Sequence, residues 1–377
     1  MSRVNKILPV VLGIFILITI LIYINFFQKR ISKIPQIPTG KTQEPAQEAP
    51  DYPRLSTVTT NLEVPWALAF LPDGSMLVTE RPGRVRLIDK EGKLLLTSVA
   101  QLLDVKPIGE GGLHGITIHP DFSNNKFVYL YYTYGESGNQ TLNQVVRFKF
   151  ENNTLLDRTV ILDKIPGAPN HDGGRIKFGP DKLLYITTGD AQNPSLAQDT
   201  NSLAGKILRI TDDGKPAPNN PFGNNVLSYG HRNPQGITWD NYGKLWAVEH
   251  GQSATDELNL IEVGKNYGWP KIRGDQKQNG LENPILHSGS DTWAPSGAAY
   301  LNGSVFFAGL RGQALYQASM DSKGVTLTEH LKGEIGRIRE VVVGPDNLLY
   351  ITTSNRDGRG IPDSEDDRVI RVNPEKL

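Results

Sequence analysis

The sequence predicts an all-β fold, a six-bladed β-propeller, and a recurring phrase carries most of that prediction. Each copy consists of a short apolar strand, a turn of the Pro-Asp or Asn-Gly kind, and a second apolar strand. Six copies occur, at residues 66–83, 115–133, 174–190, 236–251, 297–312 and 340–355. Their spacing of about 45 to 60 residues is typical of propeller blades, which surround a central channel.

Composition agrees with this fold class and excludes several functions. The 377 residues include 38 Gly and 25 Pro, as a turn-rich β protein requires. The 40 basic and 40 acidic residues balance, so no nucleic-acid partner is expected. The absence of cysteine excludes disulfides, thiolate metal sites and cysteine nucleophiles.

Residues 1–30 differ from the rest and predict a transmembrane helix that anchors the protein in a membrane. Ile7 to Phe27 form an uncharged apolar run; about 20 such residues span a hydrocarbon core of about 30 Å. No small-residue cleavage site follows, which favours an uncleaved anchor over the alternative, a cleaved signal peptide. Residues 31–55 are Pro-rich and predict a flexible linker, which leaves residues 56–377 for the propeller.

Alternating strands and long loops complete the pattern. Apolar and polar residues alternate at 85–89, 145–150, 206–210 and 368–372, and residues 195–210 could include a short helical turn. Long loops enter or leave the repeats, and loops of such length in a compact fold are often functional. The polar residues of these loops would therefore meet at a mouth of the channel.

Two loops that precede repeats contain candidate site residues. His171 comes just before the third repeat and could act as a general base, or simply hydrogen-bond its own loop. Arg232, Asn233 and Gln235 come just before the fourth repeat. The Arg232 guanidinium suits a carboxylate ligand, although a surface turn around Asn-Pro is the alternative.

Further cations and an acidic loop extend the candidate site. Arg337 and Arg339 are two residues apart, so in a strand they share a face, where they would bind an anion or else remain solvated. Arg311 ends the fifth repeat and could add another cation. Asp256 and Glu257 lie in a carbonyl-rich loop that would suit Ca²⁺. Together these residues indicate a polyanionic small molecule held with a divalent cation.

Several phrases in the chain resemble one known family. They are VPWALAFLPDG, GGLHGITIHPDF, NHDGGRIKFGPD, YGHRNPQG, EHGQSATDELN and NYGWP. They resemble the soluble glucose dehydrogenase and aldose sugar dehydrogenase family, which uses pyrroloquinoline quinone (PQQ) and Ca²⁺ at the mouth of a six-bladed propeller. The resemblance implies that His171 takes the proton of the anomeric hydroxyl while hydride passes from C1 to the quinone, giving a lactone.

The resemblance also implies the remaining site residues. The cofactor would be contacted by Glu110, Arg232, Asn233, Gln235, Arg311, Arg337 and Arg339. Its Ca²⁺ would use the carbonyls of Gly251 and Gln252, and a structural Ca²⁺ would use Glu257 and the Tyr267 carbonyl, with Asp256 as a further candidate. Glu110, Gln252 and Arg311 stand where the family often has Gln, Pro and Lys. Glu110 would repel an anionic cofactor unless it were protonated or bound Ca²⁺.

The resulting expectation is a membrane-anchored aldose dehydrogenase whose propeller lies outside the cytoplasm, on the periplasmic or extracellular face. It would pass electrons to an external acceptor such as a quinone, a dye or a small redox carrier. A Ca²⁺-dependent propeller lactonase and a non-catalytic binding propeller are the alternatives. The lactonase would need several carboxylate and Asn ligands around one metal, and the binding module would not need the histidine and arginines.

Overall fold

The computed structural model describes residues 51–135, 140–322 and 324–377. Tyr52–Leu377 form one compact unit. The predicted anchor and most of the predicted linker lie outside the described residues, so they stay predictions. Among the residues described, no helix combines the length and apolar character that crossing a membrane requires.

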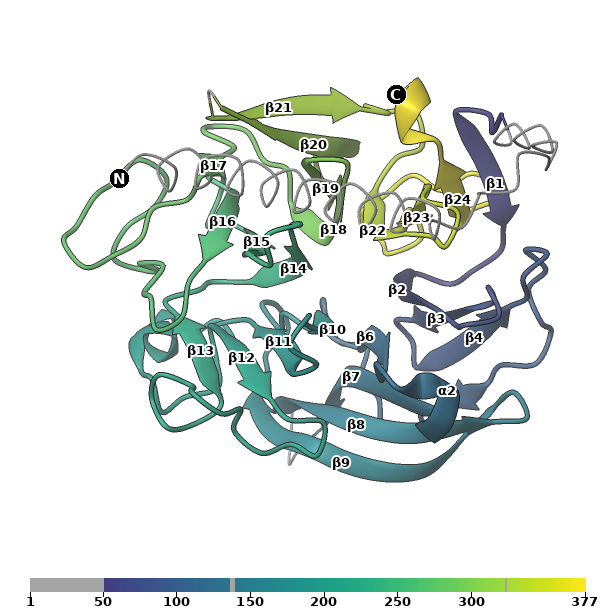
Figure 1. Ribbon diagram of the computed structural model, residues 1–377, viewed down its shortest axis with the longest axis horizontal. Coiled ribbons are helices and arrows are strands. Elements are labelled where there is room, and N and C mark those ends of the chain that lie inside the picture. Colours follow the sequence, from purple (N-terminus) through teal and green to yellow (C-terminus); the bar gives the residue numbers. More distant parts are fainter. Residues whose placement is uncertain (1–50, 136–139, 323) are drawn as a thin grey trace, which may run out of the picture. The chain divides into compact units, whose positions relative to one another are not determined.

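Six four-stranded antiparallel sheets surround a common centre, which confirms the predicted six-bladed propeller (Figure 1). Blade 1 consists of β2 Pro65–Phe70, β3 Met76–Glu80, β4 Arg84–Ile88 and β5 Ala100–Gln101. Blade 2 consists of β6 Leu113–Ile118, β7 Phe127–Gly135, β8 Thr141–Glu151 and β9 Thr154–Pro166. Blade 3 consists of β10 Ile176–Phe178, β11 Leu184–Thr188, β12 Lys206–Ile210 and β13 Val226–Tyr229. Blade 4 consists of β14 Pro234–Trp239, β15 Leu245–Glu249, β16 Glu257–Ile261 and β17 Leu286–His287. Blade 5 consists of β18 Pro295–Leu301, β19 Ser304–Gly309, β20 Ala314–Asp321 and β21 Gly324–His330. Blade 6 consists of β22 Ile338–Val343, β23 Leu349–Thr353, β24 Val369–Val372 and β1 Leu55–Thr59. Short helices lie at α2 Phe122–Asn125, Pro194–Gln198 and Pro374–Lys376, the second of them in the region where a helical turn was predicted.

Each sequence repeat forms the two inner strands of a blade. The second strand of several blades, such as β3, β11, β15 and β23, is buried along its whole length. Both faces of these strands are covered by neighbouring blades, which explains why they are almost continuously apolar. Trp66, Leu77, Leu113 and Leu130 belong to the core cluster between blades 1 and 2. Full burial of each such side chain stabilises the fold by about 1.5–3 kcal/mol.

The first strand of the propeller completes its last blade. Strand β1 pairs with β24, with Leu55 opposite Val372 and Thr57 opposite Ile370. The sheet at the C-terminal end of the chain therefore depends on a strand from the N-terminal side, and the ring is closed by main-chain hydrogen bonds. This pairing connects residues more than 300 positions apart, and no local pattern in the sequence indicates it.

The channel has two mouths with different linings. Loops that lead into the inner strands meet at one mouth, here called the upstream mouth, whereas the ends of the same strands surround the other, the downstream mouth. Between them Arg175, Glu340 and Trp66 are each at most 2% exposed. Arg175 forms an ion pair with Glu340 and stacks over the Trp66 ring at 4.3 Å. These side chains fill the channel and separate the two mouths.

Candidate active site

The upstream mouth brings together most of the predicted cofactor residues. A cavity of about 260 Å³ is lined by Glu110, Gln235, His250, Ala294, Leu310, Arg311, Arg337, Arg339 and Arg359. A smaller cavity shares His250 and is lined by Arg232, Gly251, Gln252, Glu257, Tyr267 and their neighbours. Residues from loops of four blades thus converge on one region, although they are far apart in sequence.

His171 lies beside this region and is held by Asp190. Its Nδ1 is 2.7 Å from Asp190 Oδ1, and its side chain is 18% exposed while Asp190 is fully buried. Asp190 Oδ2 in turn accepts a hydrogen bond from Trp269 Nε1 at 2.8 Å. A carboxylate at Nδ1 keeps the proton on that nitrogen and leaves Nε2 as a proton acceptor. The geometry therefore suits a general base.

The backbone around His171 is as specialised as the side chain. His171 has a φ of 68°, in the left-handed region that a non-glycine residue seldom occupies. A Cβ at Gly189 would lie 1.8 Å from the His171 carbonyl oxygen, so only glycine allows this close approach. Strand β11 ends next to Gly189, and Asp190 follows directly. The close contact between these two loops places the acid next to the histidine.

Arg337 and Arg339 occupy one buried face but have different partners. Arg337 donates to Asp357 Oδ2 from Nε at 3.0 Å and from Nη2 at 2.8 Å. Arg339 donates from Nη1 to Gln235 Oε1 at 2.9 Å. Burial lowers the pKa of Arg339 to about 9. Neither alternative from the sequence describes Arg337, because this side chain is buried and Asp357 from the same blade neutralises it.

Several buried donors of the site have no acceptor among the described residues. They are Arg232 Nε, Asn233 Nδ2 and Arg339 Nε. Arg232 lies over the Trp269 ring, and Asn233 Oδ1 accepts from the Gly173 amide at 3.0 Å, so both side chains are fixed in place. Buried donors normally find partners, and Arg232 and Arg339, which line the two cavities, leave donors free for a ligand rich in acceptors.

Glu110 is ionised and paired, which answers the question raised by its sequence position. Its Oε1 accepts from Arg359 Nη1 at 2.8 Å, and its Oε2 is 3.5 Å from the His171 amide nitrogen. Burial alone would raise the pKa of Glu110, but His250, Arg359 and Arg339 outweigh it and hold this pKa at about 2. Glu110 is thus neither protonated nor bare, because the loop after the sixth repeat supplies Arg359 as its counter-charge.

The predicted metal residues fall into two groups. Gly251, Gln252, Glu257 and Tyr267 line the smaller cavity. Asp256 instead organises its loop: Oδ1 accepts from the Gly251 amide at 2.8 Å, and Oδ2 accepts from Thr292 Oγ1 and from the amides of Trp293 and Ala294. With four donors already present, Asp256 is the least suitable of the predicted ligands.

Glu257 is a buried carboxyl group that lies opposite a second carboxylate. It lies opposite Glu249 in the β15–β16 register, and burial followed by the Glu249 charge raises the pKa of Glu257 to about 8. Asn259 Oδ1 is buried nearby without a donor. However, the described part of the chain contains no group of three or more His, Cys, Asp or Glu side chains that could hold a metal. A cation here would need backbone carbonyls, as Ca²⁺ accepts.

Four residues of the site were not predicted from the sequence: Asp190, His250, Asp357 and Arg359. Asp190 and His250 lie within two residues of the ends of the second strands of blades 3 and 4, in positions that an alignment of the repeats could have indicated. Asp357 and Arg359 lie in an irregular loop, and their positions became evident only from the closed ring.

The structure thus combines a six-bladed propeller with a His171–Asp190 pair that lies near buried donors without acceptors among the described residues. Comparison with known proteins specifies the family. Residues 62–362 match the profile of the glucose/sorbosone dehydrogenases, and the chain belongs to this family. The resemblance noted in the sequence is therefore confirmed.

Relatives and solved structures agree with this assignment. Aldose sugar dehydrogenase YliI of Escherichia coli is 32% identical over 82% of this chain and 92% of that protein. Quinoprotein glucose dehydrogenase B of Acinetobacter calcoaceticus is 31% identical over 66% of this chain and 59% of that protein. The PQQ-bound aldose sugar dehydrogenase of Streptomyces coelicolor superposes with a TM-score of 0.80 and 41% identity, over 84% of this chain and 96% of that one.

Proposed function

We propose that this protein oxidises aldoses at C1 to lactones, with PQQ and Ca²⁺ at the upstream mouth and His171 as the general base. The observation that carries the proposal is the His171–Asp190 pair next to buried donors without acceptors. Membership in the glucose/sorbosone dehydrogenase family and the PQQ-bound relative support the same function.

The residues of the upstream mouth fit PQQ, which has three carboxylates and an ortho-quinone. Arg232, Asn233 and Arg339 each offer an unsatisfied buried donor, and Arg311 adds positive charge at the cavity. The carbonyls of Gly251 and Gln252 are the proposed ligands of the associated Ca²⁺. When bound, PQQ supplies the two-electron acceptor for the hydride that leaves C1.

The chain's own contribution is orientation and a base. Asp190 holds the proton of His171 on Nδ1, so Nε2 can accept the proton of the anomeric hydroxyl. As that proton arrives, the imidazolium is stabilised by the buried Asp190 carboxylate. Loss of this proton and of the C1 hydride converts the hydroxyl-bearing carbon to the lactone carbonyl. An external acceptor would then remove the electrons. We keep as part of the proposal an N-terminal membrane anchor with the propeller outside the cytoplasm.

A titration with PQQ in the presence of Ca²⁺ tests the proposal. We expect saturable binding, followed by bleaching of the oxidised-quinone absorbance when glucose or another aldose is added. Failure to bind PQQ would remove the dehydrogenase assignment. Binding without bleaching by any of a panel of aldoses would contradict the proposed substrate class.

A further inference from the structure

The downstream mouth contains a second cavity, larger than the one at the proposed active site. It has a volume of about 610 Å³ and is bounded by the ends of the inner strands of all six blades. Its lining includes Phe70, Phe122, Phe178, Trp239 and Tyr300, together with aliphatic residues such as Val342 and Val343. Its size falls within the range of about 300–1,000 Å³ that is usual for small-molecule sites.

This cavity is not an extension of the upstream mouth. The Arg175–Glu340 ion pair and the Trp66 ring fill the channel between the two. The Arg175 guanidinium is fixed further by a hydrogen bond from Nε to the Gln235 carbonyl at 2.9 Å. A molecule in the downstream cavity would therefore bind independently of one at the upstream mouth.

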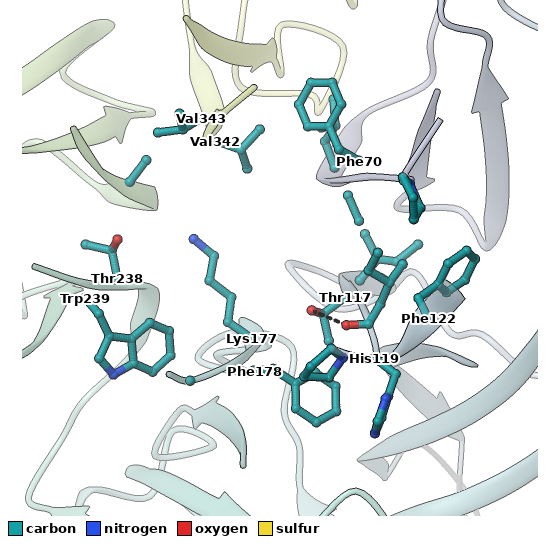
Figure 2. Close-up of a pocket in the computed structure, with 18 of the residues that line it drawn as sticks. Phe70, Thr117, His119, Phe122, Lys177, Phe178, Thr238, Trp239, Val342 and Val343 are labelled. Carbon is teal, nitrogen blue, oxygen red and sulfur yellow. Dashed lines mark hydrogen bonds between the residues drawn. The ribbon is translucent and has the colours of Figure 1, made fainter. Parts of the chain in front are cut away.

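Among the residues that the structure describes, Lys177 is the only Lys, Arg, Asp or Glu in the lining of this cavity. Figure 2 shows its side chain extending past Trp239, with the ammonium group toward Thr238 and Val342. Nζ donates to the Ala298 carbonyl at 2.8 Å, which uses one of its three N–H groups. Burial lowers the pKa of Lys177 to about 8, as expected for a cation without a counter-ion.

Other charges near Lys177 already have partners. Glu340, behind the cavity floor, is paired with Arg175. His119, also in the lining, is 3.4 Å from Asp212 Oδ2. Among the described residues, no carboxylate therefore lies in the cavity to neutralise the ammonium.

The aromatic walls are held in place by neighbouring rings. Phe178 contacts Tyr129 at 5.2 Å, Trp239 contacts Tyr185 at 5.0 Å, and Phe70 contacts Tyr350 at 4.9 Å, all edge to face. Such contacts restrict ring motion and reduce the entropy lost when a ligand binds. The cavity therefore presents a preformed apolar surface around one cation.

We propose that the downstream cavity is a second binding site, for a small organic anion with an aromatic body. The anionic group would accept hydrogen bonds from the free N–H groups of Lys177, and the aromatic body would lie against Trp239 and Phe178. A carboxylate or sulfonate suits this arrangement, because a charged acceptor offsets the cost of leaving the ammonium desolvated.

Isothermal titration of the full chain with 2-naphthoate tests this site, with neutral 2-naphthamide as the matched probe. We expect one naphthoate per chain, bound at least tenfold more tightly than the amide. Lys177→Met should weaken naphthoate binding at least tenfold and leave amide binding unchanged. Val342→Phe, which fills the cavity from another blade without touching the lysine's charge, should weaken both probes.

Arg311→Gln is the control for charge, since it removes a cation from the upstream mouth instead. If Arg311→Gln abolishes naphthoate binding while Lys177→Met and Val342→Phe do not, the anion binds at the upstream mouth and the proposal is wrong. Equal affinity for naphthoate and naphthamide, or no saturable binding up to about 1 mM, would also overturn it. Because neither probe requires PQQ or a sugar, failure here leaves the proposed dehydrogenase function untouched.

Discussion

His171 and Asp190 show how much of the site depends on single contacts. The histidine comes from the loop before blade 3 and the aspartate from the end of its second strand, yet their side chains are 2.7 Å apart. Asp190 is itself fixed by Trp269 from blade 4. The proposed base is therefore oriented by groups that the sequence separates by up to about a hundred residues.

We expect His171→Ala to reduce kcat at least about 100-fold with little change in PQQ affinity, because only the proton acceptor is lost. Asp190→Asn should also lower kcat, since the amide no longer holds the Nδ1 proton. His287→Ala, at a partly exposed surface histidine, is the control. Steady-state kinetics on PQQ-saturated enzyme give the answer, and an unchanged kcat in His171→Ala would remove this histidine from the mechanism.

Glu110 and Arg359 are expected to act as a pair. Arg359→Gln leaves an unpaired carboxylate beside the cofactor site and should weaken PQQ binding by at least about fivefold. In a Glu110→Gln background, Arg359→Gln should weaken PQQ binding by a smaller factor. Both side chains are partly exposed, at 23% and 55%, so a modest coupling is expected.

A PQQ titration of the two single variants and the double variant measures this coupling. The pKa of Glu110 in the fold, about 2, lies below its ordinary value of 4.5. The stabilising pairing is therefore complete above about pH 4.5 and is lost as the pH falls toward 2. Strictly additive effects at pH 7 would show that Glu110 and Arg359 do not interact energetically.

At the scale of elements, the β15–β16 pair places two carboxylates opposite each other at Glu249 and Glu257. Glu249 is used by His231 Nδ1 at 2.8 Å and by the Arg232 amide. No Lys, Arg or His of the described residues forms an ion pair with Glu257. Burial and the Glu249 charge therefore raise the pKa of Glu257 to about 8. Repulsion between these two carboxylates would therefore destabilise the fold when both are ionised, and a bound cation would offset it.

This arrangement predicts how stability depends on pH. An acid whose pKa is raised from 4.5 to about 8 keeps its proton in the fold after the unfolded chain has lost it, so stability should fall between about pH 4.5 and 8 in chelator. Ca²⁺ should restore stability most strongly near pH 8. Glu257→Gln should flatten the pH dependence and remove the Ca²⁺ effect.

Thermal unfolding across this pH range, with and without Ca²⁺, tests the prediction. Glu262→Gln is the matched control, because Glu262 is exposed at the end of the same hairpin region. A Ca²⁺ effect that persists in Glu257→Gln would place the cation elsewhere.

At the scale of the whole molecule, closure of the ring determines whether the site exists. Strand β1 completes blade 6 next to β24 (Figure 1). The loop that connects β23 and β24 of this blade carries Arg359 into the lining of the upstream mouth and Asp357 to Arg337. Without β1, strand β24 would become an exposed edge, and this blade would lose one of its four strands.

We expect a chain that begins at Tyr52 to unfold cooperatively, because it keeps β1 and the compact unit. A chain that begins at Thr60 lacks β1 and should lose cooperative unfolding or aggregate. Calorimetry of both chains compares them directly. Equal transition temperatures would mean that the β1–β24 pairing is not needed for closure.

The local sequence was sufficient to predict elements that depend on local periodicity. The six repeats correspond to the inner strand pairs, because alternation and turn residues specify strands and hairpins without distant partners. The loops before these strands also identified His171, Arg232, Gln235 and the Arg337–Arg339 pair, all of which lie at or beside the upstream mouth.

Repeat spacing, composition and loop residues thus determined the fold class, the blade count and most residues of the proposed site. The tertiary structure alone decided the partners of those residues: Asp190 for His171, Arg359 for Glu110 and Asp357 for Arg337. It also separated the two mouths and placed Lys177 in an apolar cavity. The physical reason is that strand periodicity is a local property, whereas charge pairing and burial depend on which loops the closed ring brings together.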